Sequence, residues 1–176
     1  MIWCDWGRAL EIGAETCAPE YRNIVFEDCD IIHGSSVNLD IQHHNRAETH
    51  HIEFRNIRVE YSKHQLSDVY QRDINALYLP PDQIRYPLLI AAPVLNSTLF
   101  IKKKEHNRIH DITYRDIYMI KDDEVPIPSS SFSGLSPDNY VENVIIDGLF
   151  VNGIRLTDRA EANISLNEYA VNITYK

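Results

Sequence analysis

A pattern of apolar residues that recurs about every 29 positions constrains the fold of this chain more than any other feature. Four segments share the order apolar-x-apolar-x-x-apolar-x-apolar, and the final NITY opens a fifth copy. The copies begin at Ile24, Ile52, Ile112, Val144 and Ile173, so the intervals between them are 28, 60, 32 and 29 residues. We interpret the interval of 60 residues as two periods that hold one degenerate copy around YPLLIAAP. A fixed period of this length indicates a repeat architecture.

Within each copy, the alternation of apolar and polar residues predicts β-strands. A two-residue interruption breaks the alternation in the middle of the copy, so the chain must bend there. Asp28, Asn56 and Asp116 occupy this interruption, and Asp147-Gly148 occupies it in the fourth copy. Asn, Asp and Gly adopt left-handed backbone angles at the least cost. Each copy therefore predicts two strands joined by a tight corner.

A shorter motif repeats in phase with the first, because Leu10-x-Ile12 and Leu39-x-Ile41 are 29 residues apart. Stacked coils of this kind bury each apolar position against its counterparts above and below. The chain lacks the asparagine-punctuated leucine pattern of leucine-rich repeats and the 3.6-residue period of helical repeats. The sequence thus predicts an all-β fold, a right-handed parallel β-helix with about five to six coils in a single domain over residues 1–176. Residues 62–82 and 121–140, rich in Pro, charge and turn formers, are predicted to be loops inserted between strands.

Charge and composition exclude several functions. The net charge of −9 and the pI near 5.3 repel phosphate backbones, so nucleic acid and anionic membranes are not expected as partners. The three cysteines show no CxxC spacing, which argues against a disulfide framework or a zinc site. No apolar run approaches the roughly 18 residues of a membrane span, and no secretion signal opens the chain. As written, the sequence predicts a cytoplasmic protein and otherwise leaves localisation open. No cofactor is expected.

Two carboxylates on the short motif form the candidate site. With Leu10 and Ile12 facing inward, Glu11 faces outward, and Asp40 and Gln42 do so one coil later. The offset of 29 residues places Glu11 beside Asp40, because adjacent strands lie about 4.8 Å apart. Two carboxylates this close disfavour double ionisation, so one of them is expected to have a raised pKa. Such a pair can supply a general acid and a base or nucleophile, as in glycoside hydrolysis.

Several residues near this pair are candidates for contact with a sugar. Arg8 and Arg46 can neutralise the carboxylates or bind an acidic sugar, and Trp6 can stack on a sugar ring. Gln42 is a further candidate for sugar contact, and His43 and His44 are expected to continue the same outward face. The alternative is that these polar side chains only solvate one wall and pair with each other. A metal site is not expected at His43, His44, His50 and His51, because adjacent residues of a strand point to opposite sides.

The repeat NIVFEDCDI…LDI…HIEFRNIRVE and the stretch GRALEIGAET resemble the later coils of pectinase-type β-helix enzymes. The closest resemblance is to glycoside hydrolase family 28, the polygalacturonases and rhamnogalacturonases. IGAE is the most specific piece, similar to the family's Ile-Gly-Ser-Glu, and the ending NYVENVIIDGLFVNGIRLT…NEYAVNITY is similar to the last coils of bacterial members. The resemblance implies hydrolysis of O-glycosyl bonds in a plant-type or other polysaccharide.

The chain departs from the family where the chemistry lies. The family's Gly-His-Gly falls on Gly7-Arg8-Ala9, so Arg8 replaces the active-site histidine. Its Arg-x-Lys falls on Asp40-Ile41-Gln42, so both cations are lost. The family's catalytic aspartates precede this region, and Asp5 matches neither of their motifs. The remaining catalytic candidates are Glu11, Asp40, Asp5 and Glu15, and the chain as written is expected to be inactive.

Three functions remain open from the sequence. The first is a C-terminal part, or a shortened relative, of a polysaccharide-degrading hydrolase, since MIWCDW already reads as strand. The second is a carbohydrate-binding or structural module without catalysis. The third is an oligomerisation module, because an exposed first coil presents unpaired backbone groups and apolar side chains. That exposed edge predicts self-association, or pairing with a missing N-terminal part.

Overall fold

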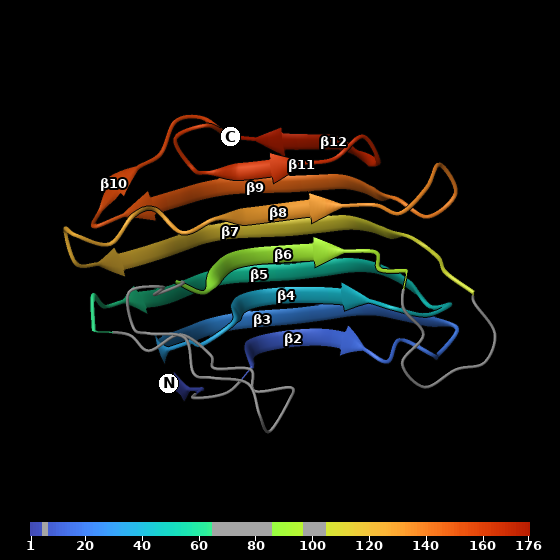
Figure 1. The fold of residues 1–176 in the computed structure, drawn as a ribbon, viewed down its shortest axis with the longest axis horizontal. Coiled ribbons are helices and arrows are strands. Elements are labelled where there is room, and N and C mark those ends of the chain that lie inside the picture. The colour runs from blue at the N-terminus through green and yellow to red at the C-terminus, as the bar shows by residue number, and fades with distance from the viewer. Residues whose placement is uncertain (5–6, 65–85, 97–104) are drawn as a thin grey trace, which may run out of the picture.

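The computed structural model describes residues 1–4, 7–64, 86–96 and 105–176, and this part of the chain is all-β, with two sheets and no helix (Figure 1). Sheet A contains β1, β3, β5, β7, β9, β10 and β12, and sheet B contains β2, β4, β6, β8 and β11. The strands span Ile2–Trp3 (β1), Arg8–Ala14 (β2), Glu20–His33 (β3), Val37–His43 (β4), Glu48–Tyr61 (β5), Leu88–Pro93 (β6), Ile109–Lys121 (β7), Ser130–Ser133 (β8), Val141–Val151 (β9), Ile154–Arg155 (β10), Ile164–Leu166 (β11) and Ala170–Tyr175 (β12).

The chain passes from one sheet to the other at almost every connection. Sheet A is ordered β1-β3-β5-β7-β9, with β10 and β12 both paired to β9, and sheet B is ordered β2-β4-β6-β8-β11. All pairs are parallel except β10 with β9. The arrows of the two sheets point in opposite directions in Figure 1, so each passage reverses the chain. Spatial order therefore follows chain order in both sheets.

The repeated apolar motif sets the register of sheet A. Ile24 pairs with Ile52, Ile112 with Val144, and Val144 with Ile173, as the predicted alignment of copies requires, and Ile52 pairs directly with Ile112. The short motif aligns in the same way in sheet B, where Leu10 pairs with Leu39 and Leu39 with Ile90.

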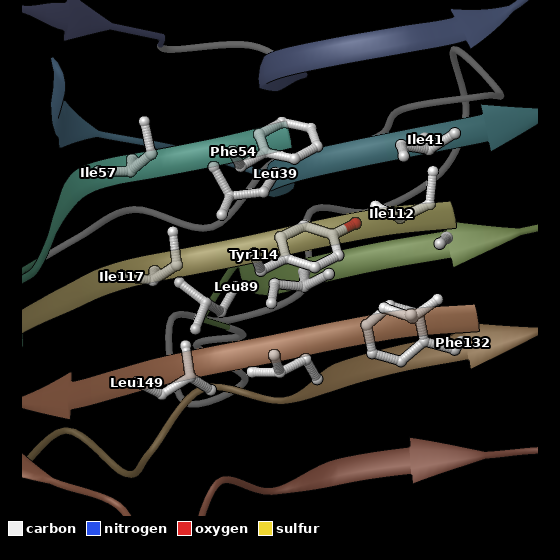
Figure 2. Packing of buried hydrophobic residues seen from close by; sticks show 14 of the residues in the cluster. Leu39, Ile41, Phe54, Ile57, Leu89, Ile112, Tyr114, Ile117, Phe132 and Leu149 are labelled. Atoms are coloured by element: carbon white, nitrogen blue, oxygen red, sulfur yellow. The ribbon is translucent and has the colours of Figure 1, made fainter. Parts of the chain in front are cut away.

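The core lies between the two sheets, where like residues stack on like (Figure 2). The rings of Phe26, Phe54 and Tyr114 form a column on sheet A, with centroids 4.8 and 5.0 Å apart. Leu39 and Leu89 project from sheet B into the same core. Burial of equivalent apolar positions in successive strands is the main stabilising term of such a fold.

The predicted corner is confirmed at all four positions. Asp28, Asn56 and Asp116 have φ angles of 55°, 52° and 53°, and Gly148 takes the same place with a φ of 86°. Asn56 Nδ2 donates to Asp28 Oδ1 at 2.5 Å, so neighbouring corners are bonded to each other. Hydrogen bonding of the strands continues on both sides of the bend, and the long strands of sheet A therefore turn without ending.

A second corner precedes the first, and the alternation argument does not find it. Asn23, His51, Asp111, Asn143 and Asn172 align across sheet A and have φ angles between 53° and 57°. We call this row the Asn23 corner and the row at Asp28 the Asp28 corner. The two corners divide each long strand into three facets.

Two expectations about the repeat are wrong. The interval between Ile52 and Ile112 is a single passage around the fold, because β5 pairs directly with β7. YPLLIAAP contains β6, which belongs to the short-strand series of sheet B. Its apolar run resembles a long-strand copy only in composition.

The segment 121–140 is not purely a loop, because Ser130–Ser133 forms β8 between β6 and β11. Phe132 is the only large apolar residue in this strand, so its pattern is too short to show a period. Backbone pairing and the buried Phe132 ring hold β8 in the sheet. The other predicted loop, 62–82, lies outside the described residues apart from 62–64.

Candidate functional site

The two candidate carboxylates lie on adjacent strands, as predicted. Glu11 of β2 and Asp40 of β4 are register partners, between the inward pairs Leu10–Leu39 and Ile12–Ile41. Both carboxylates face Arg8, whose Nε lies against Asp40 Oδ2 and 3.6 Å from Glu11 Oε1. One guanidinium thus bridges the pair, so Arg8 has the neutralising position that the sequence suggested.

Asp40 differs from Glu11 in its burial. The Asp40 side chain is 2% exposed, whereas that of Glu11 is 29% exposed. Burial raises the pKa of Asp40 to about 7; Arg8 opposes this rise and Glu11 adds to it. The predicted rise in pKa is confirmed, but its main cause is desolvation, and repulsion between the carboxylates is secondary.

Asp40 also borders a hollow of about 490 Å³ on the outer face of sheet B. Oδ1 of Asp40 is buried without a hydrogen-bond partner among the described residues. An unpaired buried acceptor costs about 1–3 kcal/mol, and this cost adds to the preference of Asp40 for its neutral form. Arg8 and Gln42 border the same hollow.

The remaining lining was missed by the sequence argument. Ser35, Ser36, Tyr86 and Pro87 border the hollow, and all four directly precede a strand of sheet B. Parallel strands in register begin at the same edge of their sheet, and backbone bonds from Ser36 N to Gly7 O and from Leu88 N to Ser36 O continue this alignment outside the strands. Because these residues directly precede aligned strands, their place at this edge of sheet B could have been predicted from the sequence.

His43 does not face outward, so the expectation that it contacts a sugar from the strand face is wrong. His43 is fully buried and His44 is 5% exposed. His43 follows Leu39 and Ile41 in the alternation, so it points to the core side, and its Nδ1 lies 3.3 Å from Thr49 Oγ1. Burial lowers the pKa of His43 to about 4.

Other predicted site residues lie away from the hollow or outside the described residues. Arg46 follows the far end of β4, and its Nε donates to Cys17 O at 2.9 Å. Glu15 is exposed in the connection after β2 and does not border the hollow. Asp5 and Trp6 lie outside the described residues.

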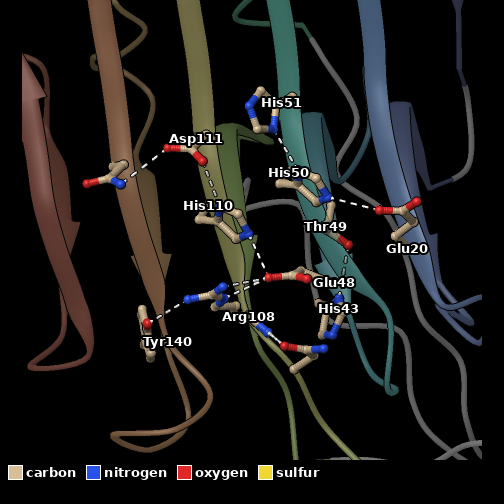
Figure 3. A network of polar contacts seen from close by, with 12 residues as sticks. Glu20, His43, Glu48, Thr49, His50, His51, Arg108, His110, Asp111 and Tyr140 are labelled. Carbon is tan, nitrogen blue, oxygen red and sulfur yellow. Dashed lines mark hydrogen bonds and ion pairs between the residues drawn. The ribbon is translucent and has the colours of Figure 1, made fainter.

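A second polar cluster, which the sequence argument did not propose, covers the outer face of sheet A (Figure 3). The rings of His50 and His110 stack at 4.8 Å with an interplanar angle of 3°. His110 Nδ1 lies 2.7 Å from Asp111 Oδ2, and Nε2 lies 3.0 Å from Glu48 Oε1. Arg108 Nε donates to the same Glu48 oxygen at 2.9 Å. We call these residues, with His51, Glu20 and Tyr140, the histidine cluster.

Hydrogen bonds set the charges in this cluster. The bond from Arg108, followed by that from His110, holds the pKa of Glu48 below its ordinary value. Burial acts to raise the pKa of Asp111, but bonds from His110 and Asn143 outweigh it and lower that pKa. Both carboxylates therefore remain acceptors for the rings beside them.

No group of three or more metal-ligating side chains gathers in the part of the chain that the structure describes. Among the same residues, no helix has the length and apolar character needed to cross a membrane. Comparison with protein-family models, curated proteins and solved structures finds no match to this chain. The resemblance to glycoside hydrolase family 28 therefore rests on the sequence motifs alone.

Proposed function

We propose that this chain is a right-handed parallel β-helix of the polysaccharide-degrading type, and that it binds an oligosaccharide in the hollow on sheet B. The alternation of the chain between two parallel sheets, with spatial order following chain order, supports the solenoid. Connections between parallel strands of one sheet are right-handed in nearly all proteins, which supports its hand.

The observation that carries the binding proposal is Asp40 at the edge of the hollow. The side chain is almost completely buried, one oxygen lacks a partner among the described residues, and the raised pKa keeps the carboxyl partly protonated near neutral pH. A protonated carboxyl both donates and accepts, which matches a sugar hydroxyl. Gln42, Ser35 and Tyr86 add amide, hydroxyl and aromatic groups around the same space.

The proposed ligand is a neutral sugar, and binding is proposed without hydrolysis. Arg8 already faces two carboxylates, so the hollow offers no spare cation at this point for an acidic sugar. Arg8 also occupies the position of the active-site histidine in the motif of glycoside hydrolase family 28, and Asp40 and Gln42 occupy the positions of the two cations in its Arg-x-Lys motif. Each of these differences removes a group that the family's reaction requires.

Binding is tested by titrating the protein with cellotriose, xylotriose and digalacturonate while recording amide chemical shifts. We expect the neutral sugars to shift resonances of Gln42 and Tyr86, and Gln42→Ala to weaken binding about 10-fold, the cost of one lost hydrogen bond. We also expect the wild-type affinity to decrease as the pH rises through 7, because Asp40 then loses its proton. In Asp40→Asn the affinity should not change with pH.

Glu142→Ala provides the control, because Glu142 lies on sheet A and outside the hollow. Equal loss of binding in Glu142→Ala and Gln42→Ala would contradict the proposed site. Release of reducing sugar from polygalacturonate or xylan, abolished in Asp40→Asn and Glu11→Gln, would instead show that the pair is catalytic.

A second candidate function, self-association through β3, is favoured by the incomplete burial of that strand. Ile24 and Phe26 are half-buried, whereas their partners Ile52 and Phe54 are 1% and 0% exposed. Among the described residues, β3 pairs with β5 along its length but with β1 only at Ile31 and His33. The rest of its second edge presents apolar side chains and backbone groups that can pair with another chain. Sedimentation velocity over a wide range of concentrations should show association that Phe26→Glu abolishes. Ile120→Glu, which adds the same charge at an exposed apolar residue of β7, should leave it unchanged; a monomer at every concentration would rule this function out.

A further inference from the structure

A groove of about 770 Å³ runs across the middle facet of sheet A, on the opposite face of the molecule from the hollow beside Asp40. The Asn23 corner forms one wall, and Arg115 contributes to the other. The groove crosses five strands, β3, β5, β7, β9 and β12, at right angles to their direction. Four intervals of about 4.8 Å give it a length of about 19 Å.

The floor of the groove combines apolar, acidic and hydroxyl-bearing side chains. Val25, Thr113, Ile145 and Thr174 point outward from successive strands, with Glu53 between the first two. Val25 is 49% exposed on the outer side of β3 and adds apolar surface to the floor. A surface of this kind fits a ligand that carries both C–H and O–H groups.

The wall presents the side-chain amides of Asn23, Asn143 and Asn172, with His51 and Asp111 between the first two. Asn143 Nδ2 donates to Asp111 Oδ1 at 3.2 Å, and Asn172 Nδ2 donates to Asn143 Oδ1 at 3.3 Å. A primary amide has two N–H donors and an oxygen with two acceptor sites. Asn172 Nδ2 also donates to Glu142 Oε1 at 3.5 Å, so both of its N–H groups are used. Among the described residues, Asn143 keeps one N–H donor and Asn172 keeps its oxygen at the β9 and β12 end of the groove, and Asn23 adds an amide at the β3 end.

The histidine cluster holds this wall in place from outside the groove (Figure 3). His51 Nδ1 lies 2.6 Å from His50 Nδ1, and His110 contacts Asp111 at 2.7 Å. Because the rings of His50 and His110 are themselves stacked, the two wall residues are fixed relative to one another. A wall ordered before binding lowers the entropic cost of binding.

The charges of the groove favour an uncharged ligand. Glu53 lies 3.5 Å from Arg115 and 3.4 Å from Arg55, and Asp111 accepts from His110 and Asn143. An extended peptide binds a sheet by pairing with the backbone of an edge strand. Here β5, β7 and β9 are paired on both sides, so a peptide lying over these three strands would find no free strand edge.

We propose that the groove on sheet A binds a neutral, linear oligosaccharide that lies along the stacking direction of the strands. Hydroxyls of successive sugar units contact the amides of the Asn23 corner and the hydroxyls of Thr113 and Thr174. The apolar faces of the sugar rings lie on Val25 and Ile145. The groove shares no residue with the hollow on sheet B, so this site stands whether or not that hollow binds sugar.

The test is a titration of the full chain with cellohexaose, xylohexaose and mannohexaose, followed by amide chemical shifts. We expect at least one hexasaccharide to shift the amide resonances of Thr113, Asn143 and Thr174. The corresponding trisaccharide should bind at least 10-fold more weakly, because it spans fewer of the strands that the groove crosses. Asn143→Gly removes one amide while glycine retains the left-handed backbone angle, and it should weaken binding about 10-fold.

Asn56→Gly is the matched control, because Asn56 has nearly the same φ angle and also bonds to the neighbouring rung, but it belongs to the Asp28 corner outside the groove. Its affinity should equal that of the wild type. The proposal is overturned if no hexasaccharide shifts the groove residues, if trisaccharide and hexasaccharide bind equally, or if the two glycine variants lose the same affinity. Shifts confined to Gln42 and Tyr86 would also overturn it, while supporting the site on sheet B.

Discussion

Asp40→Asn should be more stable than the wild type above pH 7 and equal to it in acid. The pKa of Asp40 is about 7 in the folded chain and near 3.8 in the unfolded chain. The folded state therefore binds the proton more tightly than the unfolded state does. The contribution of Asp40 to the unfolding free energy is fully present below pH 3.8 and is lost as the pH rises through 7. At about 1.4 kcal/mol for each pH unit, the loss is about 4 kcal/mol. Asparagine has no proton to lose, so the variant avoids this cost.

His43 acts in the opposite direction over the same range of pH. Its pKa is about 4 in the folded chain against 6.5 in the unfolded chain, so the unfolded state binds the proton first. Stability from this group is present above pH 6.5 and lost as the pH falls through 4, by about 3 kcal/mol. In the wild type, the pH-dependent contributions of Asp40 and His43 to the unfolding free energy nearly cancel. The wild-type stability alone therefore reveals neither contribution.

Urea unfolding at a series of pH values between 3.5 and 8 separates the two groups. The difference in unfolding free energy between Asp40→Asn and the wild type should grow with pH, because all other groups cancel in the subtraction. The difference for His43→Asn should grow as the pH falls, since asparagine can retain the contact with Thr49 without binding a proton. Differences that do not change with pH would show that Asp40 and His43 are not buried as described.

The repeat could be predicted from the sequence because its information is local and recurs. The alternation in each copy fixes which residues enter the core, and the constant offset fixes their partners, so Glu11 and Asp40 could be placed side by side. The interruption at Asp28 and Asn56 could be interpreted because few residues adopt a left-handed angle at low cost. The Asn23 corner was missed because it precedes the first apolar residue and breaks no alternation, although Asn or Asp occupies four of its five positions.

The environment of the site could not be predicted from the same pattern. Alternation indicates that Asp40 faces away from the core, but its burial depends on what covers that face. Ser35 and Tyr86, which border the hollow, lie in connections whose paths no period describes. The inward direction of His43 was available from alternation, because His43 is two residues after Ile41. We expected His43 at the surface because histidine is polar. That expectation was wrong, since the ring is buried and contacts Thr49.

Phe54→Ala should cost about 3–5 kcal/mol of unfolding free energy, a large fraction of the stability of a domain this size. The ring is fully buried and lies between Phe26 and Tyr114, so alanine would leave a cavity that is closed on both sides by rings held in register by β3 and β7. Because strand pairing fixes the spacing of about 4.8 Å, the neighbouring strands cannot close this gap. Urea unfolding at neutral pH gives the value directly.

Two further variants show whether burial within the stack, rather than aromatic contact, supplies this energy. Phe26→Ala removes a ring at the end of the same column, where it is half-buried, and should cost about 1–2 kcal/mol. Phe150→Ala removes a ring that stacks on Tyr118 at 4.9 Å on the outer face of sheet A, and about 1 kcal/mol is expected. If all three variants lost the same amount, the energy would come from ring contact alone, and a core formed by successive layers between the two sheets would not explain the stability of this chain.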